Sequence, residues 1–329
     1  MMQKIVPAKL QKGDEIRVIA PATGLKIIGL DCRQIAKERF EAMGLKVSFA
    51  TNTTDENFDM FASTDIKKRA DDVMEAFLDK NVKAIFTILG GFNSNQILPF
   101  LDYEVIKNNP KILCGYSDIT ALLSAIEEKT GLVCFYGPHY SSIGMKKGNE
   151  YTLDMLEKVL FTGESELKIS DEWSDDLWFI DQENRDFIEN EGWWVLQEGN
   201  AKGELKGGNL GTFLLLNGTP YQQEFKKDTV LMIEDCFSAE DIDGKYFMRQ
   251  LQSLAQRDDF ENVKAVVIGR FQKASKVSRE FLQAVVNNIP QLKGLPVIAN
   301  LDFGHTTPIA TLPIGGMCEI NNGKIKVWW

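Results

Sequence analysis

The sequence predicts an α/β protein whose first half forms a mostly parallel sheet and whose second half is of mixed α+β type. Two observations lead to this prediction. Up to about residue 160, short apolar runs alternate with amphipathic stretches of helical length, as in repeated βαβ units whose sheet is covered on both faces. After residue 165 the chain becomes polar and tryptophan-rich, and the strands and helices that follow show no regular alternation.

The elements of the first half are expected to alternate along the chain. Strands are expected at 15–20, 45–50, 83–89, 111–115 and 132–136. Helices are expected at 32–44, at 65–80, briefly after the glycine-rich turn 90–95, from Ser117 onward and at 151–161. In such sheets functional residues lie at the carboxyl ends of the strands, and both the glycine-rich turn and Ser117 fall there.

The second half is expected to begin with an irregular stretch and to continue with mixed elements. Residues 166–206 are polar and irregular. Strands are then expected at 229–234 and 263–269, helices around 243–257 and 276–288, and short strands up to the C-terminus. We place the domain boundary near residue 165, which gives domains of residues 1–165 and 166–329.

The composition is that of an ordinary globular protein, with 329 residues, 44% hydrophobic and 26% charged. The net charge is −10, and there is no basic block. Because nucleic acids and anionic membranes attract cationic surfaces, neither is expected as a main partner. There is no signal-peptide pattern at the N-terminus, and no apolar run reaches the roughly 20 residues of a membrane span, so we expect a cytoplasmic protein.

The cysteines and histidines indicate neither a metal site nor a disulfide framework. The cysteines are odd in number, well separated and without CxxC spacing: Cys32, Cys114, Cys134, Cys236 and Cys318. The two histidines of the chain, His139 and His305, belong to no HExxH pattern. We therefore expect reduced thiols, no metal and no cofactor.

Ser117, in the stretch CGYSDIT (114–120), is the first candidate for chemistry. It follows an apolar strand and precedes a helix-like run, and a strand–turn–helix of this kind presents a serine hydroxyl as a nucleophile. The backbone N–H of Asp118 would face the same reaction centre, beside the positive end of the helix dipole. The alternative is that Ser117 caps the helix, and the missing second glycine of GxSxG favours that interpretation locally.

The glycine-rich turn LGGFNSN (89–95) is the second candidate. Glycines after a strand let the backbone approach a ligand closely, and a glycine N–H there can serve as a second oxyanion donor. The turn is neither GxGxxG nor a P-loop, so a dinucleotide site is not indicated. A tight turn that needs glycine for a positive φ explains the sequence equally well.

A serine nucleophile needs a base and a carboxylate that orients the base. His139 follows the strand after the serine helix, so topology favours it, while His305 lies far along the chain in a loop bounded by glycine and proline. Either histidine can instead be structural. Glu234 ends the apolar strand TVLMIE, where a carboxylate is costly unless it is paired. Capping of the next helix by Glu234 or Asp235, and orientation of the histidine by Asp118, stay open as alternatives.

Aromatic residues gather in the otherwise polar second-half stretch: Trp173, Trp178, Phe179, Trp193 and Trp194. Indole rings stack on planar ligands such as nucleobases. The plainer interpretation, which the residues alone favour, is that these side chains anchor a long loop to its domain.

Several motifs occur in the order found in one known family. They are GGFNSNQILPFLDY, NPKILCGYSDITALL, FYGP, GGNL, VLMIED and FGHTTP. Through them the sequence resembles the LD-carboxypeptidase family of serine peptidases over nearly its whole length. Within that family it is most similar to the microcin C immunity branch.

The resemblance implies a Ser–Glu–His triad formed by Ser117, Glu234 and His305, and it leaves His139 a structural or substrate-rim role. The nucleophile would come from the first domain and the other two residues from the second, so the active site would lie in the cleft between the domains. The family fold is a Rossmann-like N-terminal domain followed by a C-terminal domain of mixed, barrel-like strands.

The resemblance also implies how a substrate is held. Oxyanion donors would be the backbone N–H groups of Gly91 and Asp118, and substrate contacts are expected at Gly90, Asn93 and Trp178. No metal takes part in this chemistry. The family commonly assembles as a homodimer, which we expect here.

The resemblance leaves two substrate classes open. Enzymes of the microcin branch cut the amide between a terminal aspartyl residue and a nucleotide-like moiety, and an aromatic loop stacks on adenine. The tryptophan-rich insertion favours this branch, so the expected partner is a small peptide or peptidyl-nucleotide. The murein branch removes the terminal D-amino acid from an L,D-tetrapeptide. A third hypothesis, a catalytically silent protein that binds a small ligand in the interdomain cleft, rests only on the two-domain architecture.

Overall fold

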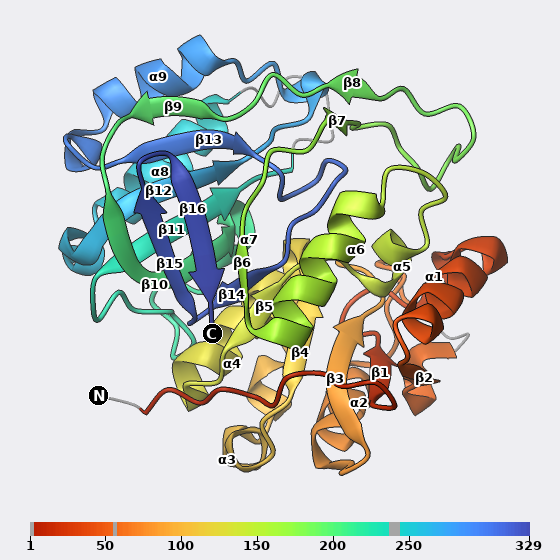
Figure 1. Cartoon of the computed structure of the whole chain (residues 1–329). Helices are drawn as coiled ribbons and strands as arrows, with labels where there is room; N and C mark the ends of the chain where they lie inside the picture. Colours follow the sequence, from red (N-terminus) through yellow and green to blue (C-terminus); the bar gives the residue numbers. More distant parts are fainter. Residues whose placement is uncertain (1–2, 55–57, 237–243) are drawn as a thin grey trace.

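A computed structural model of the chain describes residues 3–54, 58–236 and 244–329. These residues form a six-stranded sheet drawn mainly from the first half of the chain and an eight-stranded sheet drawn mainly from the second (Figure 1). The helix α4 (Thr120–Thr130) contacts strands of both sheets, and it follows directly on the turn that carries Ser117.

The first sheet has the strand order β14-β5-β4-β3-β1-β2. Its strands are β1 (Glu15–Ile19), β2 (Lys46–Phe49), β3 (Val82–Thr87), β4 (Ile112–Gly115), β5 (Cys134–Tyr136) and β14 (Leu312–Ile314). The first five run parallel, whereas β14 comes from the second half of the chain and pairs antiparallel with β5. The mostly parallel, Rossmann-like sheet predicted for the first half is confirmed.

Helices alternate with these strands in the expected βαβ order. They are α1 (Leu30–Ala42), α2 (Ile66–Leu78), α3 (Tyr103–Asn108), α4, α5 (Tyr140–Ile143) and α6 (Glu150–Glu157). The sequence sets the start of α2 through its N-cap, because the carboxylate of Asp65 accepts the backbone N–H groups of Lys67 and Lys68. The inner face of α2 buries Val73 and Phe77 in the first-sheet core.

The second sheet has the strand order β6-β16-β15-β10-β11-β12-β13-β9 and curls into a half-barrel (Figure 1). Its strands are β6 (Glu164–Glu166), β9 (Trp194–Gln197), β10 (Ala201–Asn209), β11 (Thr229–Glu234), β12 (Val263–Gly269), β13 (Val297–Leu301), β15 (Met317–Asn321) and β16 (Lys324–Trp328). Strands β10 to β13 run parallel, and the flanking pairs are antiparallel. The helices α7 (Leu210–Leu214), α8 (Lys245–Ala255) and α9 (Arg279–Asn288) and the strand pair β7 (Glu172–Trp173) and β8 (Ile188–Glu189) complete the second half. The mixed, barrel-like second half is confirmed.

Three helices begin two or more residues later than expected. The helix expected from Ser117 begins only at Thr120, because residues 117–119 form a separate 3₁₀ turn. The helices expected at 243–257 and 276–288 are shorter, and residue 243 itself lies outside the described residues. Among the residues that the structure describes, no helix has the length and apolar character needed to cross a bilayer.

Strand β10 was not expected, since its glycines and charged residues are typical of a loop. The glycines are explained by the close approach of the neighbouring strand: a Cβ on Gly207 would lie 2.0 Å from the backbone oxygen of Met232 on β11. The strand therefore needs glycine because of its neighbour. The domain boundary near residue 165 stays a prediction, and β14 crosses back from the second half into the first sheet.

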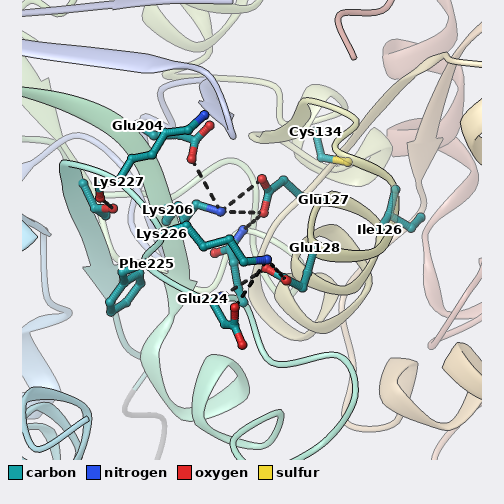
Figure 2. Close-up of polar contacts among 12 residues, drawn as sticks. Ile126, Glu127, Glu128, Cys134, Glu204, Lys206, Glu224, Phe225, Lys226 and Lys227 are labelled. Atoms are coloured by element: carbon teal, nitrogen blue, oxygen red, sulfur yellow. Dashed lines mark hydrogen bonds and ion pairs between the residues drawn. The ribbon is translucent and has the colours of Figure 1, made fainter. Parts of the chain in front are cut away.

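A buried ion pair joins α4 to the second sheet (Figure 2). The ammonium group of Lys206, on β10, lies 3.0 and 3.1 Å from the carboxylate oxygens of Glu127, on α4. The two side chains are only 4% and 8% exposed. Gln223 donates a further hydrogen bond to Glu127 at 2.5 Å, and the carboxylate of Glu204 lies 3.7 Å from the ammonium group. This cluster holds the end of α4 that is farther from Ser117.

Replacing Lys206 with Met is expected to destabilise the protein, because the Glu127 carboxylate would stay buried without its countercharge. The loss in free energy of unfolding should be about 3–5 kcal/mol, the usual result of removing one partner of a buried ion pair. Urea unfolding followed by circular dichroism measures this loss. The control is Lys326→Met, which breaks an exposed pair with Glu164 and should change the stability little. Equal losses in both variants would contradict the role given to the buried pair.

Candidate active site

Three side chains form one hydrogen-bonded chain at the junction of the two sheets. Ser117 Oγ lies 2.8 Å from His305 Nε2, and His305 Nδ1 lies 2.7 Å from Glu234 Oε2. Ser117 follows β4 of the first sheet, Glu234 ends β11 of the second, and His305 lies in the loop after β13. The structure thus brings together the three residues that the resemblance singled out and that lie far apart in the sequence.

Ser117 has a backbone φ of +61°, an uncommon value for a residue with a side chain. This conformation costs on the order of 1–2 kcal/mol and persists only where the surroundings hold it. The following helix begins at Thr120, and its N-cap residue is Ile119. The interpretation of Ser117 as the helix cap is therefore wrong, because the helix starts later and the Ser117 hydroxyl is directed to His305.

Glu234 carries a buried charge that is matched on both carboxylate oxygens. The residue is 1% exposed. Oε2 faces His305, while Oε1 accepts the hydroxyl of Tyr136 at 2.5 Å and the side-chain amide of Asn209 at 3.1 Å. Burial raises the pKa of Glu234, but His305 and these hydrogen bonds outweigh burial and keep that pKa below its usual value. Glu234 is therefore ionised, and both of its carboxylate oxygens accept hydrogen bonds from residues of the site.

His305 is presented by a tight loop after β13. Burial lowers its pKa, but the adjacent Glu234 carboxylate outweighs burial and holds the pKa of His305 well above its usual value. The preceding Gly304 has a φ of +104°, and a Cβ there would lie 2.7 Å from Glu234 Oε2. Glycine is therefore needed for the loop to bring His305 against Glu234. Asp302 lies earlier in the same loop, and its carboxylate is 2.6 Å from the buried guanidinium of Arg270, which follows β12.

The glycine-rich turn after β3 lies against Ser117. A Cβ on Gly90 would lie 3.2 Å from Ser117 Oγ and 3.5 Å from the backbone nitrogen of Asp118. The next residue, Gly91, lines the same cleft as Ser117. The N–H groups expected to bind an oxyanion, those of Gly91 and Asp118, thus belong to backbone that borders the serine, and their role stays a prediction.

Buried polar side chains hold this glycine-rich turn in place. The carboxylate of Asp118 accepts the backbone N–H groups of Asn93 and Ser94 at 3.1 and 2.8 Å. The side chain of Asn93 is buried and bonds to Ser63 and to the guanidinium of Arg69. Asn93 therefore supports the turn from behind, and the substrate contact expected at Asn93 stays a prediction. Arg69 was missed from the sequence because basic residues on an amphipathic helix are usually exposed.

A cleft of about 570 Å³ opens above Ser117 and His305 and has largely apolar walls. Its large apolar side chains come from separate loops and are Ile27, Met60, Phe61, Phe92, Trp178 and Phe179. Met60 is 89% exposed and Phe92 is 85% exposed. Apolar surface left exposed around a cleft is typical of a binding site. Among the described residues that line this cleft there is no lysine, arginine, aspartate or glutamate.

The aromatic residues of the second-half insertion divide between two positions. Trp178 and Phe179 line the cleft, with their rings edge to face and 5.8 Å apart. Trp173 packs on the guanidinium of Arg270, and the indole nitrogen of Trp194 donates to a neighbouring glutamate. Trp173 and Trp194 therefore anchor the insertion to the rest of the protein, whereas Trp178 lines the cleft.

His139 does not join the hydrogen-bonded chain of Ser117. Its Nδ1 lies 2.7 Å from Thr87 Oγ1, and its ring lies 4.2 Å from the ring of Tyr116. Burial, helped by the charge of His305, lowers the pKa of His139 well below its usual value, so the ring is neutral. The topological preference for His139 as the base is wrong, because the ring of His139 bonds to Thr87 and not to Ser117. His139 does line the cleft.

The other acids near the site serve different purposes. Asp118 fastens the glycine-rich turn and does not orient the histidine. Asp235 is buried beside Glu234, and burial together with that neighbouring charge raises the pKa of Asp235 to about 7. Its carboxylate accepts the backbone N–H of Cys236 at 2.8 Å. Within the part of the chain that the structure describes, no cluster of three or more histidine, cysteine, aspartate or glutamate side chains is arranged to hold a metal.

Two residues that bind Glu234 were not anticipated from the sequence, namely Tyr136 and Asn209. Both end a strand, β5 and β10 respectively, so both lie at the sheet edge where functional residues of parallel sheets gather. Both also belong to motifs that carried the resemblance, FYGP and GGNL. A polar residue at the end of a buried strand is the signal that could have found them.

The chain is similar in sequence to known proteins over most of its length. The sequence patterns of the LD-carboxypeptidase N-terminal domain and C-terminal domain match residues 16–137 and 202–320. The putative carboxypeptidase YocD of Bacillus subtilis (strain 168) is 49% identical over 324 residues, which cover 98% of each chain. The microcin C7 self-immunity protein MccF of Escherichia coli is 33% identical over 78% of this chain and 76% of its own. A probable murein peptide carboxypeptidase of Bacillus subtilis (strain 168) is 29% identical over 97% of this chain and 92% of its own.

Solved structures share the two-sheet fold. The MccF-like protein from Bacillus anthracis str. Ames superposes with a TM-score of 0.95 and 47% sequence identity, over 98% of this chain and 99% of its own. The microcin C7 self-immunity protein MccF in complex with aspartyl sulfamoyl adenosine superposes with a TM-score of 0.85 and 29% identity, over 99% of this chain and 98% of its own. Both superpositions extend over the two sheets of this chain, because they cover at least 98% of its length.

Replacing Gly304 with Ala is expected to destabilise the protein more than the same change at Gly294. Both glycines have a positive φ, so both substitutions carry a conformational cost of roughly 1–2 kcal/mol. A Cβ on Gly294 meets nothing within 4 Å, whereas a Cβ on Gly304 must displace the Glu234 carboxylate. Denaturant unfolding of the two variants measures the difference. If the two variants lose the same free energy of unfolding, the close approach of Gly304 to Glu234 is not the reason that glycine is needed at residue 304.

Proposed function

This chain belongs to the LD-carboxypeptidase family of peptidases, and on that basis we propose that it hydrolyses the amide between a terminal aspartyl residue and a nucleotide-like group, as in microcin C-type immunity. Ser117, His305 and Glu234 act as the catalytic triad. The observation that carries the proposal is their hydrogen-bonded chain, with contacts of 2.8 and 2.7 Å, at the base of an apolar cleft.

In this mechanism the Ser117 hydroxyl gives its proton to Nε2 of His305 while its oxygen attacks the scissile carbonyl. In neutral His305, Glu234 keeps the proton on Nδ1, so that Nε2 is free to accept, and Glu234 stabilises the imidazolium that forms. The backbone N–H groups of Gly91 and Asp118 bind the tetrahedral oxyanion. His305 then protonates the leaving amine, and a water molecule deprotonated by His305 releases the acyl group from Ser117.

The walls of the cleft favour a leaving group that carries a planar, uncharged ring system. Trp178 and Phe179 offer aromatic surface on which a nucleobase can stack. The described lining residues include neither lysine nor arginine, so they offer no cationic partner to a carboxylate of either substrate, and the preference rests on the aromatic surface. The relative whose structure holds aspartyl sulfamoyl adenosine shares this fold, which supports the same substrate class here.

The alternative reaction is the release of a terminal D-amino acid from an L,D-tetrapeptide by the same triad. The similarity to the probable murein peptide carboxypeptidase of Bacillus subtilis supports this alternative. Because Ser117 would be the nucleophile in both reactions, the two substrates can be compared on one protein. The third hypothesis, a silent ligand-binding protein, differs from both because it predicts no role for the Ser117 hydroxyl.

We also propose that the chain acts as a homodimer in the cytoplasm, as the resemblance and the well-separated cysteines imply. The division into domains at about residue 165 belongs to the same set of proposals. Light scattering on the purified protein measures the mass of the assembly, and a monomer at micromolar concentration would speak against the dimer.

Replacing Ser117 with Ala is expected to lower kcat about 10⁴- to 10⁶-fold, because the nucleophile is lost. The assay follows hydrolysis of aspartyl sulfamoyl adenosine and of an L,D-tetrapeptide by mass spectrometry. The control is Ser124→Ala, which removes a buried hydroxyl from α4 and should leave both reactions unchanged. Near-normal turnover by Ser117→Ala would rule out the mechanism. Cleavage of the tetrapeptide alone by the wild type would select the alternative reaction.

Replacing Trp178 with Ala is expected to lower kcat/KM for the nucleotidyl amide roughly 10- to 100-fold, the effect of losing one base–aromatic stack. Cleavage of the L,D-tetrapeptide, if it occurs, should change little. The matched control is Trp173→Ala, since Trp173 packs on Arg270 and is absent from the lining of the cleft. Equal losses in both tryptophan variants would assign Trp178 to anchoring instead of substrate binding.

A further inference from the structure

We propose that Tyr136 is a positioning residue for the reaction at Ser117, which holds the nucleophile and Glu234 in register across the two sheets. This inference rests on the proposed function, because it assigns Tyr136 a task only if Ser117, His305 and Glu234 react as a unit. Tyr136 does not line the cleft among the residues described, so it would act through the triad and not on the substrate.

The geometry that carries the inference is a pair of hydrogen bonds made by one hydroxyl group. Tyr136 Oη donates to Glu234 Oε1 at 2.5 Å and accepts the backbone N–H of Ser117 at 3.3 Å. Tyr136 is the last residue of β5, the strand next to the one that leads to Ser117. Glu234 belongs to the other sheet. One phenol oxygen therefore touches the nucleophile's backbone in the first sheet and the carboxylate in the second.

The hydroxyl of Tyr136 is suited to donate to a carboxylate. Tyr136 is fully buried, and burial together with the Glu234 charge raises its pKa well above the usual value of tyrosine, so the proton stays on the phenol. Hydrogen bonds from a hydroxyl to a carboxylate are short and strong, and 2.5 Å is within their usual range. The bond also draws negative charge away from the oxygens of Glu234, which weakens the hold of Glu234 on the proton of His305.

The second contact of Tyr136 concerns the strained turn. Ser117 has a φ of +61°, and it lies three residues before the start of α4, so its N–H is not part of the hydrogen bonding within that helix. Accepting this N–H gives the strained backbone a fixed partner. Asn209 is a second donor to Glu234 Oε1, at 3.1 Å, and its own backbone N–H bonds to Thr120. Asn209 therefore bonds to Thr120, three residues after Ser117, whereas Tyr136 bonds to Ser117 itself.

Replacing Tyr136 with Phe removes one oxygen atom and both hydrogen bonds. We expect kcat to fall on the order of 10- to 100-fold, the range for one hydrogen bond to a charged group, with KM nearly unchanged. The pKa of His305 should rise, because Glu234 loses a donor and then holds the imidazolium more strongly. His305 must be neutral to accept the serine proton, so the acid limb of the kcat/KM profile should move to higher pH.

The matched control is Tyr140→Phe. Tyr140 is also fully buried, and its hydroxyl donates to the backbone oxygen of Arg33 at 2.7 Å, away from the triad. Its removal tests what the loss of any buried tyrosine hydroxyl does to stability. Both variants leave in place the titratable groups that surround His305 within residues 3–54, 58–236 and 244–329, which are Glu234, Asp235, Cys236, His139 and Tyr116. A purely structural role would lower the stability of both variants and move the pH profile of neither.

The decisive measurement needs no substrate. The chain has two histidines, so NMR of protein labelled at histidine gives the signals of two imidazoles, and the one missing in His305→Gln belongs to His305. A higher pKa of His305 in Tyr136→Phe, with no change in Tyr140→Phe, supports the inference even if neither amide substrate is hydrolysed. An unchanged pKa of His305 in Tyr136→Phe overturns the inference, while the activity of Ser117→Ala decides the proposed function separately.

If Tyr136→Phe does not fold, the wild-type protein answers the same question. A buried hydroxyl proton shared with a carboxylate exchanges slowly with water and gives a separate downfield NMR signal. A signal of this kind that shows a contact to the ring protons of Tyr136 supports the bond to Glu234. A freely exchanging Tyr136 hydroxyl overturns it.

Discussion

The carboxylate of Glu234 lies inside the protein, and a charge placed there is costly unless hydrogen bonds and a countercharge surround it. His305, Tyr136 and Asn209 provide these partners from three different segments of the chain. Because each partner must reach the same two oxygens, the buried charge sets where the His305 loop, β5 and β10 lie relative to β11. The position of Ser117 follows, since its hydroxyl bonds to His305 and its backbone N–H to Tyr136.

A site assembled from two sheets needs a rigid frame, because a shift of either sheet would separate its parts. Helix α4 is held at both ends: near Ser117 the carboxylate of Asp118 binds the glycine-rich turn, and at the far end Glu127 pairs with Lys206 of the second sheet. Between these points the helix is almost wholly buried. The positive φ of Ser117 can persist in this frame, since relaxing it would break contacts on both sides.

The three residues proposed to react and the walls of the cleft come from different parts of the fold. Ser117, Glu234 and His305 stand at the ends of sheet strands or directly after them, whereas the apolar walls come from loops such as the one that carries Trp178. Apolar walls also lower the local dielectric, which strengthens the electrostatic interactions at the base of the cleft. Loops tolerate changes of sequence better than the elements they connect, and this chain is similar in sequence to relatives named for different substrates.

The sequence by itself determined the parallel first sheet and the mixed second half, because buried strands between helices leave a periodic apolar pattern. Motifs in order pointed to Ser117, Glu234 and His305, although topology alone favoured His139 as the base. Strand β10 was not predicted, because its glycines have a low propensity for strands and are required by the close approach of the neighbouring strand. The inward turn of Asn93 and the positive φ of Ser117 were decided only by the tertiary structure. A hydrogen bond joins neighbours in space, and linear order carries no record of which residues those neighbours are.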